Sequence, residues 1–277
     1  MTMMLEIEGE DELMDLSPYL AVFDDANCQE EEADDDEAGS SARTLLIDVP
    51  RIDVTWAHRF LMATQRIPPG MAVERLSCSI HAVFDDDDWM MVLDVLAQAL
   101  SNCTFREARV ATQGPLVNPS RAMELCKQVA KNTIYVLRIA DVSADAPLLG
   151  GALAGLQQSK HPHERLQLFC ELRSGLTHQI AHYMIACCRD GHCNDSGAIS
   201  PSRFSGGFLF LHLGLVTPGV WTLVAGLFHS SHLRSLQINA REMMSPPAQI
   251  LHVLRSAVAT NTTMDKLVLF FPLSQPV

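Results

Sequence analysis

Histidine and cysteine residues gather in one part of this sequence, between positions 178 and 193. His178 and His182 are four residues apart, which places both imidazoles on one side of a helix. Tetrahedral zinc accepts nitrogen and sulfur ligands of the kinds found here. The residues that follow shortly after the two histidines are Cys187, Cys188, His192 and Cys193. One prediction for this region is therefore a zinc-stapled or metal-dependent domain.

Other features of the same region favour a loop with incidental thiols. The segment from His178 to His182 lacks the glutamate that a zinc hydrolase uses as its base, and the cysteines lack a paired C-x-x-C spacing. The sequence also contains no glycine-rich phosphate loop, nucleophile elbow or paired acid–base motif. We therefore expect a non-enzymatic protein without a cofactor, with the metal site as the alternative.

A repeated pattern determines which elements position these residues. An apolar-x-x-apolar-x-apolar segment followed by an amphipathic stretch recurs about every 29 residues, most clearly at residues 134–139, 233–238 and 264–269. A fixed period of this length indicates strand–helix units that bury their apolar faces against each other. The predicted first anchor residues of the strands are Leu45, Leu76, Ala108, Leu137, Leu166, Leu209, Leu236 and Leu267.

Prolines mark the expected starts of the helices between these strands. Four of them follow the preceding anchor by similar distances, and three come directly after a residue that commonly caps helix N-termini. The prolines are Pro119, Pro147, Pro218 and Pro246, and the expected caps are Asn118, Thr217 and Ser245. One interval, between Leu166 and Leu209, is longer than the others and predicts an insertion near residues 188–205.

The combination of strand, loop and helix resembles the ribonuclease-inhibitor type of leucine-rich repeat. Helices of this family end in Ala-Leu-x-x-Asn-x-x-Leu, and the segment Leu96–Phe105 is the closest match to that pattern in this chain. The resemblance implies an α/β horseshoe with parallel strands on the concave face and helices on the convex face. It also implies that the chain binds another protein through the concave face. The family's asparagine after the second strand leucine is replaced here by His81, Gln113, Val142, Glu171, Gly214, Arg241 and Pro272.

Charge divides the chain into two regions. Residues 1–42 contain fifteen of the 33 acidic residues and no lysine or arginine, which predicts a disordered acidic tail. Residues 43–277 are nearly neutral and form the predicted solenoid of about seven to eight units. An apolar stretch in the tail, Leu13–Phe23, is typical of segments that dock on a partner. The alternative is that the tail has no binding target and only aids solubility. The acidic balance gives no support for nucleic-acid binding.

Two features bear on the compartment. Residues 204–233 carry no formal charge and are long enough to span a bilayer, but their glycines and proline and their strand–helix pattern favour a buried repeat instead of a membrane segment. The N-terminus has no secretion signal, so we expect an intracellular protein, cytoplasmic or nuclear. The eight cysteines should then be reduced, with Cys78 on a strand and Cys126 on a helix as small buried groups.

Residues that flank the anchors point to the opposite side of the strands and should form the concave binding face. Arginines in four consecutive units predict a basic row on this face. This row should bind a partner protein, which could be acidic. The acidic tail should then compete with the partner for the same arginines. The expected partner-binding residues are Arg75, Arg109, Arg138, Arg165, Phe208, Phe210 and Gln237. Because no helix follows the last predicted strand, we also expect self-association through this uncapped C-terminal repeat.

Overall fold

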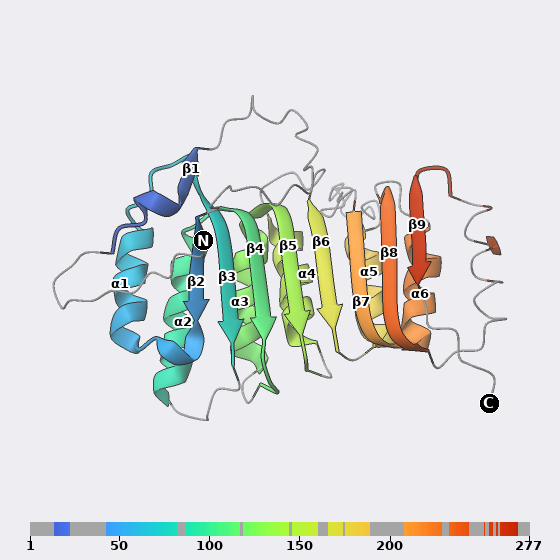
Figure 1. Ribbon diagram of the computed structural model, residues 1–277, viewed down its shortest axis with the longest axis horizontal. Coiled ribbons are helices and arrows are strands. Elements are labelled where there is room, and N and C mark those ends of the chain that lie inside the picture. The colour runs from blue at the N-terminus through green and yellow to red at the C-terminus, as the bar shows by residue number, and fades with distance from the viewer. Residues whose placement is uncertain are drawn as a thin grey trace, which may run out of the picture.

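The computed structural model describes residues 14–22, 43–81, 87–116, 119–143, 146–159, 166–173, 175–188, 208–228, 233–243 and 261–270, together with residues 252, 255, 256 and 259. Strands and helices alternate along these residues, and the strands lie side by side in one sheet (Figure 1). The chain is therefore an α/β protein built from repeated strand–helix units. The predicted insertion lies mostly outside the described residues.

Eight strands form a parallel sheet in the order in which they occur in the sequence, and the sheet is not closed. Each strand pairs with the strand of the preceding unit, so contacts form chiefly between neighbouring units. The strands are β2 (Thr44–Asp48), β3 (Met71–Ile80), β4 (Phe105–Thr112), β5 (Thr133–Asp141), β6 (Gln167–Leu172), β7 (Phe208–Val216), β8 (Ser235–Met243) and β9 (Lys266–Phe270).

The register of this sheet confirms the predicted anchors in every unit except one. From β2 to β5 the residues in register are Leu45, Leu76, Ala108 and Leu137, and from β7 to β9 they are Leu209, Leu236 and Leu267. In β6 the residue in register is Leu168, so the prediction of Leu166 is wrong by two positions. Both leucines are buried because side chains two residues apart share a strand face.

Helices cover one face of the sheet (Figure 1). Successive helices contact each other in chain order, which extends the stack along the sheet. The helices are α1 (Val54–Thr64), α2 (Asp87–Ser101), α3 (Pro119–Lys131), α4 (Pro147–Gln158), α5 (His178–Cys188) and α6 (Pro218–Leu227), and a short 3-10 helix, η3 (Val49–Arg51), follows β2.

Three of the four predicted helix starts are confirmed, because Pro119, Pro147 and Pro218 are the first residues of α3, α4 and α6. Thr217 precedes α6 as predicted, but its side chain does not cap this helix. Its hydroxyl instead donates a hydrogen bond to the carbonyl oxygen of Leu176 in the preceding unit. The remaining expected signals, Asn118, Ser245 and Pro246, lie outside the described residues.

Asparagine side chains connect the turns that follow successive helices. The Asn132 amide donates to the carbonyl oxygens of Leu100 and Ser101, at 3.3 Å each, and the Asn261 amide donates to the carbonyl of Phe228 at 2.8 Å. The Asn102 amide lies 3.4 Å from the hydroxyl of Thr64. Each of these asparagines therefore bonds to the end of the preceding helix, which fixes the spacing of neighbouring units.

A buried carboxylate organises the turn between β5 and α4. Asp141 is 1% exposed and accepts hydrogen bonds from the backbone amides of Ser143 and Leu148, at 2.9 and 2.8 Å, and from the hydroxyl of Thr112 at 3.3 Å. Ala146, which directly precedes α4, has a φ of 42° and no capping side chain. Asp141 therefore supplies from a distance the acceptor that the N-terminus of α4 requires.

Two glycines allow α3 and α4 to pack with their backbones in close contact. A Cβ atom placed on Gly151 would overlap the carbonyl oxygen of Met123, and one on Gly155 would overlap the carbonyl oxygen of Lys127. A Cβ atom on the adjacent Gly150 would have the sulfur of Met123 as its nearest neighbour, at 3.9 Å. The close packing of the two helices therefore requires glycine at positions 151 and 155 but not at position 150.

Part of the predicted tail packs on the first units of the stack. Residues 17–19 form the 3-10 helix η1 (Ser17–Tyr19), and β1 (Leu20–Val22) pairs antiparallel with the start of β3. Met14, Leu16 and Tyr19 are 9%, 5% and 3% exposed and belong to the hydrophobic core. The expectation of disorder therefore does not hold for residues 14–22, whose apolar stretch docks on this chain itself. The other tail residues lie outside the described part.

The uncharged stretch of residues 204–233 contains β7 and α6, which continue the repeat as predicted. α6 has ten residues, and its neighbours β7 and β8 pair in the sheet. Within the described part of the chain, no helix combines the length and apolar character needed to cross a membrane.

Four cysteines, Cys78, Cys103, Cys126 and Cys170, are buried with free thiols. This confirms the expected burial of Cys78 on a strand and Cys126 on a helix. Removal from water disfavours the thiolate, so burial raises the pKa of all four thiols, to about 12 for Cys78 and Cys103. The negative charge of Asp48 raises the pKa of Cys78 further.

We expect the free energy of unfolding to decrease as the pH rises above about 9, the ordinary pKa of a thiol. In this range the unfolded chain loses thiol protons that the folded chain retains, so each thiol lowers the stability by up to about 1.4 kcal/mol per pH unit. Urea unfolding in reducing buffer at about pH 8 and pH 10 measures the slope. Cys78→Ala should have a shallower slope than the wild-type chain, and an identical slope would contradict the assignment.

Candidate binding site on the open face of the sheet

The sheet face that no described helix covers, here called the open face, carries the residues that flank the anchors (Figure 1). Side chains alternate along a strand, so these residues point away from the buried anchors. On β4 to β7 they form a group of charged and aromatic residues, here called the Arg–Phe cluster. Its members are Arg109, Arg138, Phe169, Phe208 and Phe210.

The strand register aligns four members of the Arg–Phe cluster in one row across the sheet. Arg109 on β4 is in register with Arg138 on β5, which is in register with Phe169 on β6 and then with Phe210 on β7. Neighbouring strands lie about 4.8 Å apart, so these side chains are close enough to interact directly. Both arginines are exposed, and the phenylalanines are half-buried.

Direct contacts connect the arginine and phenylalanine halves of the cluster. The guanidinium carbon of Arg138 lies 4.3 Å from the centroid of the Phe169 ring, which is a cation–π contact. The centroid of Phe169 lies 5.3 Å from that of Phe208 and 5.7 Å from that of Phe210, with the rings tilted. Such contacts stabilise a pair by about 0.5–1 kcal/mol at exposed sites, so they pre-organise the surface.

The charges on this face are only partly paired. Arg75 lies in the row before the anchors and forms an ion pair with Glu107 on the neighbouring strand, with Nε and Oε2 2.9 Å apart. Arg109 and Arg138 form no ion pair with any residue in the described part of the chain. The exposed Glu171, two residues after Phe169, is a second acid on the open face. Arg109 and Arg138 are therefore two positive charges on neighbouring strands that no described acid neutralises.

Of the predicted row of four arginines, the structure places two side by side. Arg109 and Arg138 are neighbours as expected, whereas Arg75 is in another row beside Glu107. Arg165 lies outside the described residues, and the shift of the anchor to Leu168 places Phe169 next to Arg138 instead. The predicted residues Phe208, Phe210 and Gln237 are on the open face, with Gln237 in register with Phe210.

Phe169 is the cluster member that the predicted anchors do not include. With Leu166 as the predicted anchor, Phe169 does not count as a flanking residue. The spacing contained a signal for the correct register, because Leu168 follows Leu137 by 31 residues, as Leu76 follows Leu45. Leu168, Cys170 and Leu172 also continue the alternation of buried residues along β6.

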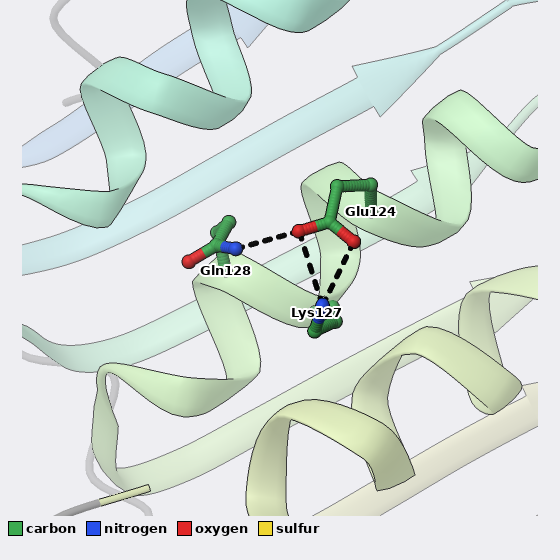
Figure 2. A network of polar contacts seen from close by, with 3 residues as sticks. All are labelled: Glu124, Lys127 and Gln128. Atoms are coloured by element: carbon green, nitrogen blue, oxygen red, sulfur yellow. Dashed lines mark hydrogen bonds and ion pairs between the residues drawn. The ribbon is translucent and has the colours of Figure 1, made fainter. Parts of the chain in front are cut away.

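On the opposite side of the molecule, polar residues of α3 pair with each other (Figure 2). Glu124 accepts a hydrogen bond from Gln128 at 2.6 Å and forms an ion pair with Lys127 at 3.0 Å. Burial acts to raise the pKa of Glu124, but hydrogen bonds from Gln128 and Lys127 and the charge of Lys127 and Lys131 outweigh it, so the pKa is lowered. These local pairs satisfy Glu124 and Lys127, in contrast to the arginine pair.

The structure describes only part of the predicted zinc cluster. His178 and His182 lie on α5 and are exposed, and Nδ1 of His178 is 3.1 Å from the hydroxyl of Thr222 on α6. Cys187 and Cys188 end this helix, but their side chains, together with His192 and Cys193, lie outside the described part. Among the described residues, no group of three or more histidine, cysteine, aspartate or glutamate side chains could hold a metal ion.

Two other expectations involve residues at the ends of the chain. Contact between the acidic tail and the arginines concerns residues that lie outside the described part, apart from 14–22, and stays a prediction. Phe270 on β9 is 65% exposed, and self-association through this repeat stays a prediction.

No protein-family model matches this chain, and no curated protein matches its sequence. The function must therefore be inferred from the site itself. The Arg–Phe cluster combines donors suited to carboxylates with aromatic surface suited to apolar side chains.

Proposed function

We propose that this chain is a non-enzymatic protein–protein interaction module that binds a partner protein through the open face of its sheet. We further propose that it is a leucine-rich-repeat protein of the ribonuclease-inhibitor-like type, with the open face as the concave side of a horseshoe. The parallel strands in chain order and the helices on one face support this proposal. The asparagine at the turn after α2, in the segment with the closest family pattern, supports it as well.

The observation that carries the functional proposal is the Arg–Phe cluster itself. Three phenylalanines and two arginines lie together on a sheet face without a covering helix in the described part. Aromatic residues and arginine are the residue types most enriched at the energetic centres of protein interfaces. The same residues contribute little to the core, which lies on the other side of the sheet.

Quantitative affinity purification from cells of the source organism tests this function. The tagged full chain should recover partner proteins. A Phe169→Glu, Phe210→Glu double variant should recover about tenfold less of them, because the substitutions place charges at the centre of the interface. A Met62→Glu, Met91→Glu double variant adds the same charge on α1 and α2, at residues that are 52% and 49% exposed, and should retain them. Equal recovery by all three chains would contradict the proposal.

A further inference from the structure

The arrangement of the Arg–Phe cluster restricts the kind of segment that fits it. The arginine pair lies on β4 and β5, and the paired phenylalanines Phe169 and Phe210 lie on β6 and β7. The centres of these two pairs are therefore two strand spacings apart, or about 10 Å. A segment in the extended polyproline II conformation advances about 3.1 Å per residue and returns its side chains to the same side every three residues. A segment that crosses the strands therefore reaches from the arginine pair to the phenylalanines in about three residues.

The arginine side of the cluster is suited to a carboxylate. The guanidinium of Arg138 lies over the ring of Phe169 and forms no ion pair with any described residue, so its planar fork of N–H donors can bind a carboxylate. Arg109 is in register with Arg138, so two positive charges face the same space on neighbouring strands. A carboxylate between them would accept charge-assisted hydrogen bonds from both and relieve their repulsion.

The phenylalanine side is suited to an aromatic or large aliphatic side chain. Phe169, Phe208 and Phe210 provide tilted rings that are already in contact with each other, so a ligand side chain adds to a pre-formed apolar surface. Glu171, in register with Ala140 and His212, borders this side. Its charge disfavours an acidic ligand residue over β6, which leaves β4 and β5 as the location for the acid.

We propose that the open face recognises a segment of a partner protein in the polyproline II conformation with the pattern acid-x-x-apolar. Its acidic residue binds Arg109 and Arg138, and its aromatic or large aliphatic residue binds Phe169, Phe208 and Phe210. This inference rests on the proposed function and specifies the chemistry of the partner. The ion pair between Arg75 and Glu107 has no part in it, because Arg75 is already neutralised.

Selection of random twelve-residue peptides displayed on phage against the immobilised full chain tests the pattern. Enriched peptides should share an acidic residue and, three positions away, an aromatic or large aliphatic residue. Fluorescence anisotropy of a synthetic consensus peptide should show affinity about tenfold weaker for Arg138→Glu and for Phe169→Ala than for the wild-type chain. Arg75→Ala, the matched control on the same face, should change the affinity by less than about threefold.

Several results would overturn the inference. The inference fails if no peptides are enriched or if the enriched peptides lack an acidic residue. It also fails if Arg138→Glu leaves the affinity for the consensus peptide unchanged, or if Arg75→Ala lowers that affinity as much as Arg138→Glu does. Selected peptides that lack the acid but lose binding in Phe169→Ala would leave the open face as the binding surface and remove only the proposed pattern. Peptides whose binding is insensitive to both cluster variants would contradict the proposed function as well.

Discussion

Asp141→Ala is expected to lower the free energy of unfolding by about 3–5 kcal/mol, because it removes a buried carboxylate that holds three donors. The amides of Ser143 and Leu148 and the hydroxyl of Thr112 would lose their acceptor. The start of α4, whose preceding residue Ala146 has no capping side chain, would lose its only described side-chain acceptor. Urea unfolding of the variant and the wild-type chain at neutral pH measures the difference.

Two variants serve as controls for the Asp141 prediction. Asp141→Asn keeps one carbonyl oxygen in the same place and should cost less than the alanine substitution. Asp265→Ala removes a carboxylate that is 73% exposed and 3.8 Å from Arg234, so it should cost less than about 0.5 kcal/mol. If Asp141→Ala and Asp265→Ala had equal effects, the turn between β5 and α4 would not depend on the buried carboxylate.

Gly151→Ala is expected to lower the free energy of unfolding by about 2–3 kcal/mol, since the added methyl group would overlap the backbone of α3. The overlapping atom is the carbonyl oxygen of Met123, which cannot move without separating the two helices. This cost exceeds the gain of up to about 1 kcal/mol that alanine brings to a helix interior. Thermal unfolding followed by circular dichroism measures the net change.

Gly150→Ala is the matched control because it makes the same substitution one residue earlier in α4. Its new Cβ would have no heavy-atom neighbour closer than 3.9 Å, so only the gain in helix propensity remains. We therefore expect this variant to be as stable as the wild-type chain or more stable. A destabilisation of Gly150→Ala as large as that of Gly151→Ala would show that the close contact between α3 and α4 is not the cause.

Much of the fold could be predicted from the sequence because it follows from periodic features. Anchors such as Leu76, Ala108 and Leu137 recur at nearly constant intervals, and Pro119, Pro147 and Pro218 begin helices at matching positions. Each of these signals is local and is repeated in several units. Stacking then requires only that every unit bury the same side.

Other features depend on distant residues and could not be predicted in this way. The side chains of Asp141 and Thr112 meet across 29 residues of sequence, and no local pattern indicates that one will hold the other. Phe169 was missed because Leu166 and Leu168 both suit a buried strand position, and pairing with the neighbouring strands decides between them. Composition predicts that residues 14–22 belong to the tail, because it does not reveal that their apolar side chains complete the core of the first units.

Site-specific photo-crosslinking tests most directly whether the open face binds a partner. A photoreactive p-benzoylphenylalanine replaces Gln167, an exposed open-face residue in register with Val136 and Phe208, or replaces the exposed Gln98 on α2. In cells of the source organism, position 167 should form a discrete crosslinked species with another protein, position 98 should not, and Arg138→Glu should remove the species. Crosslinks that form equally from both positions, or only from position 98, would contradict the assignment of the binding site to the open face.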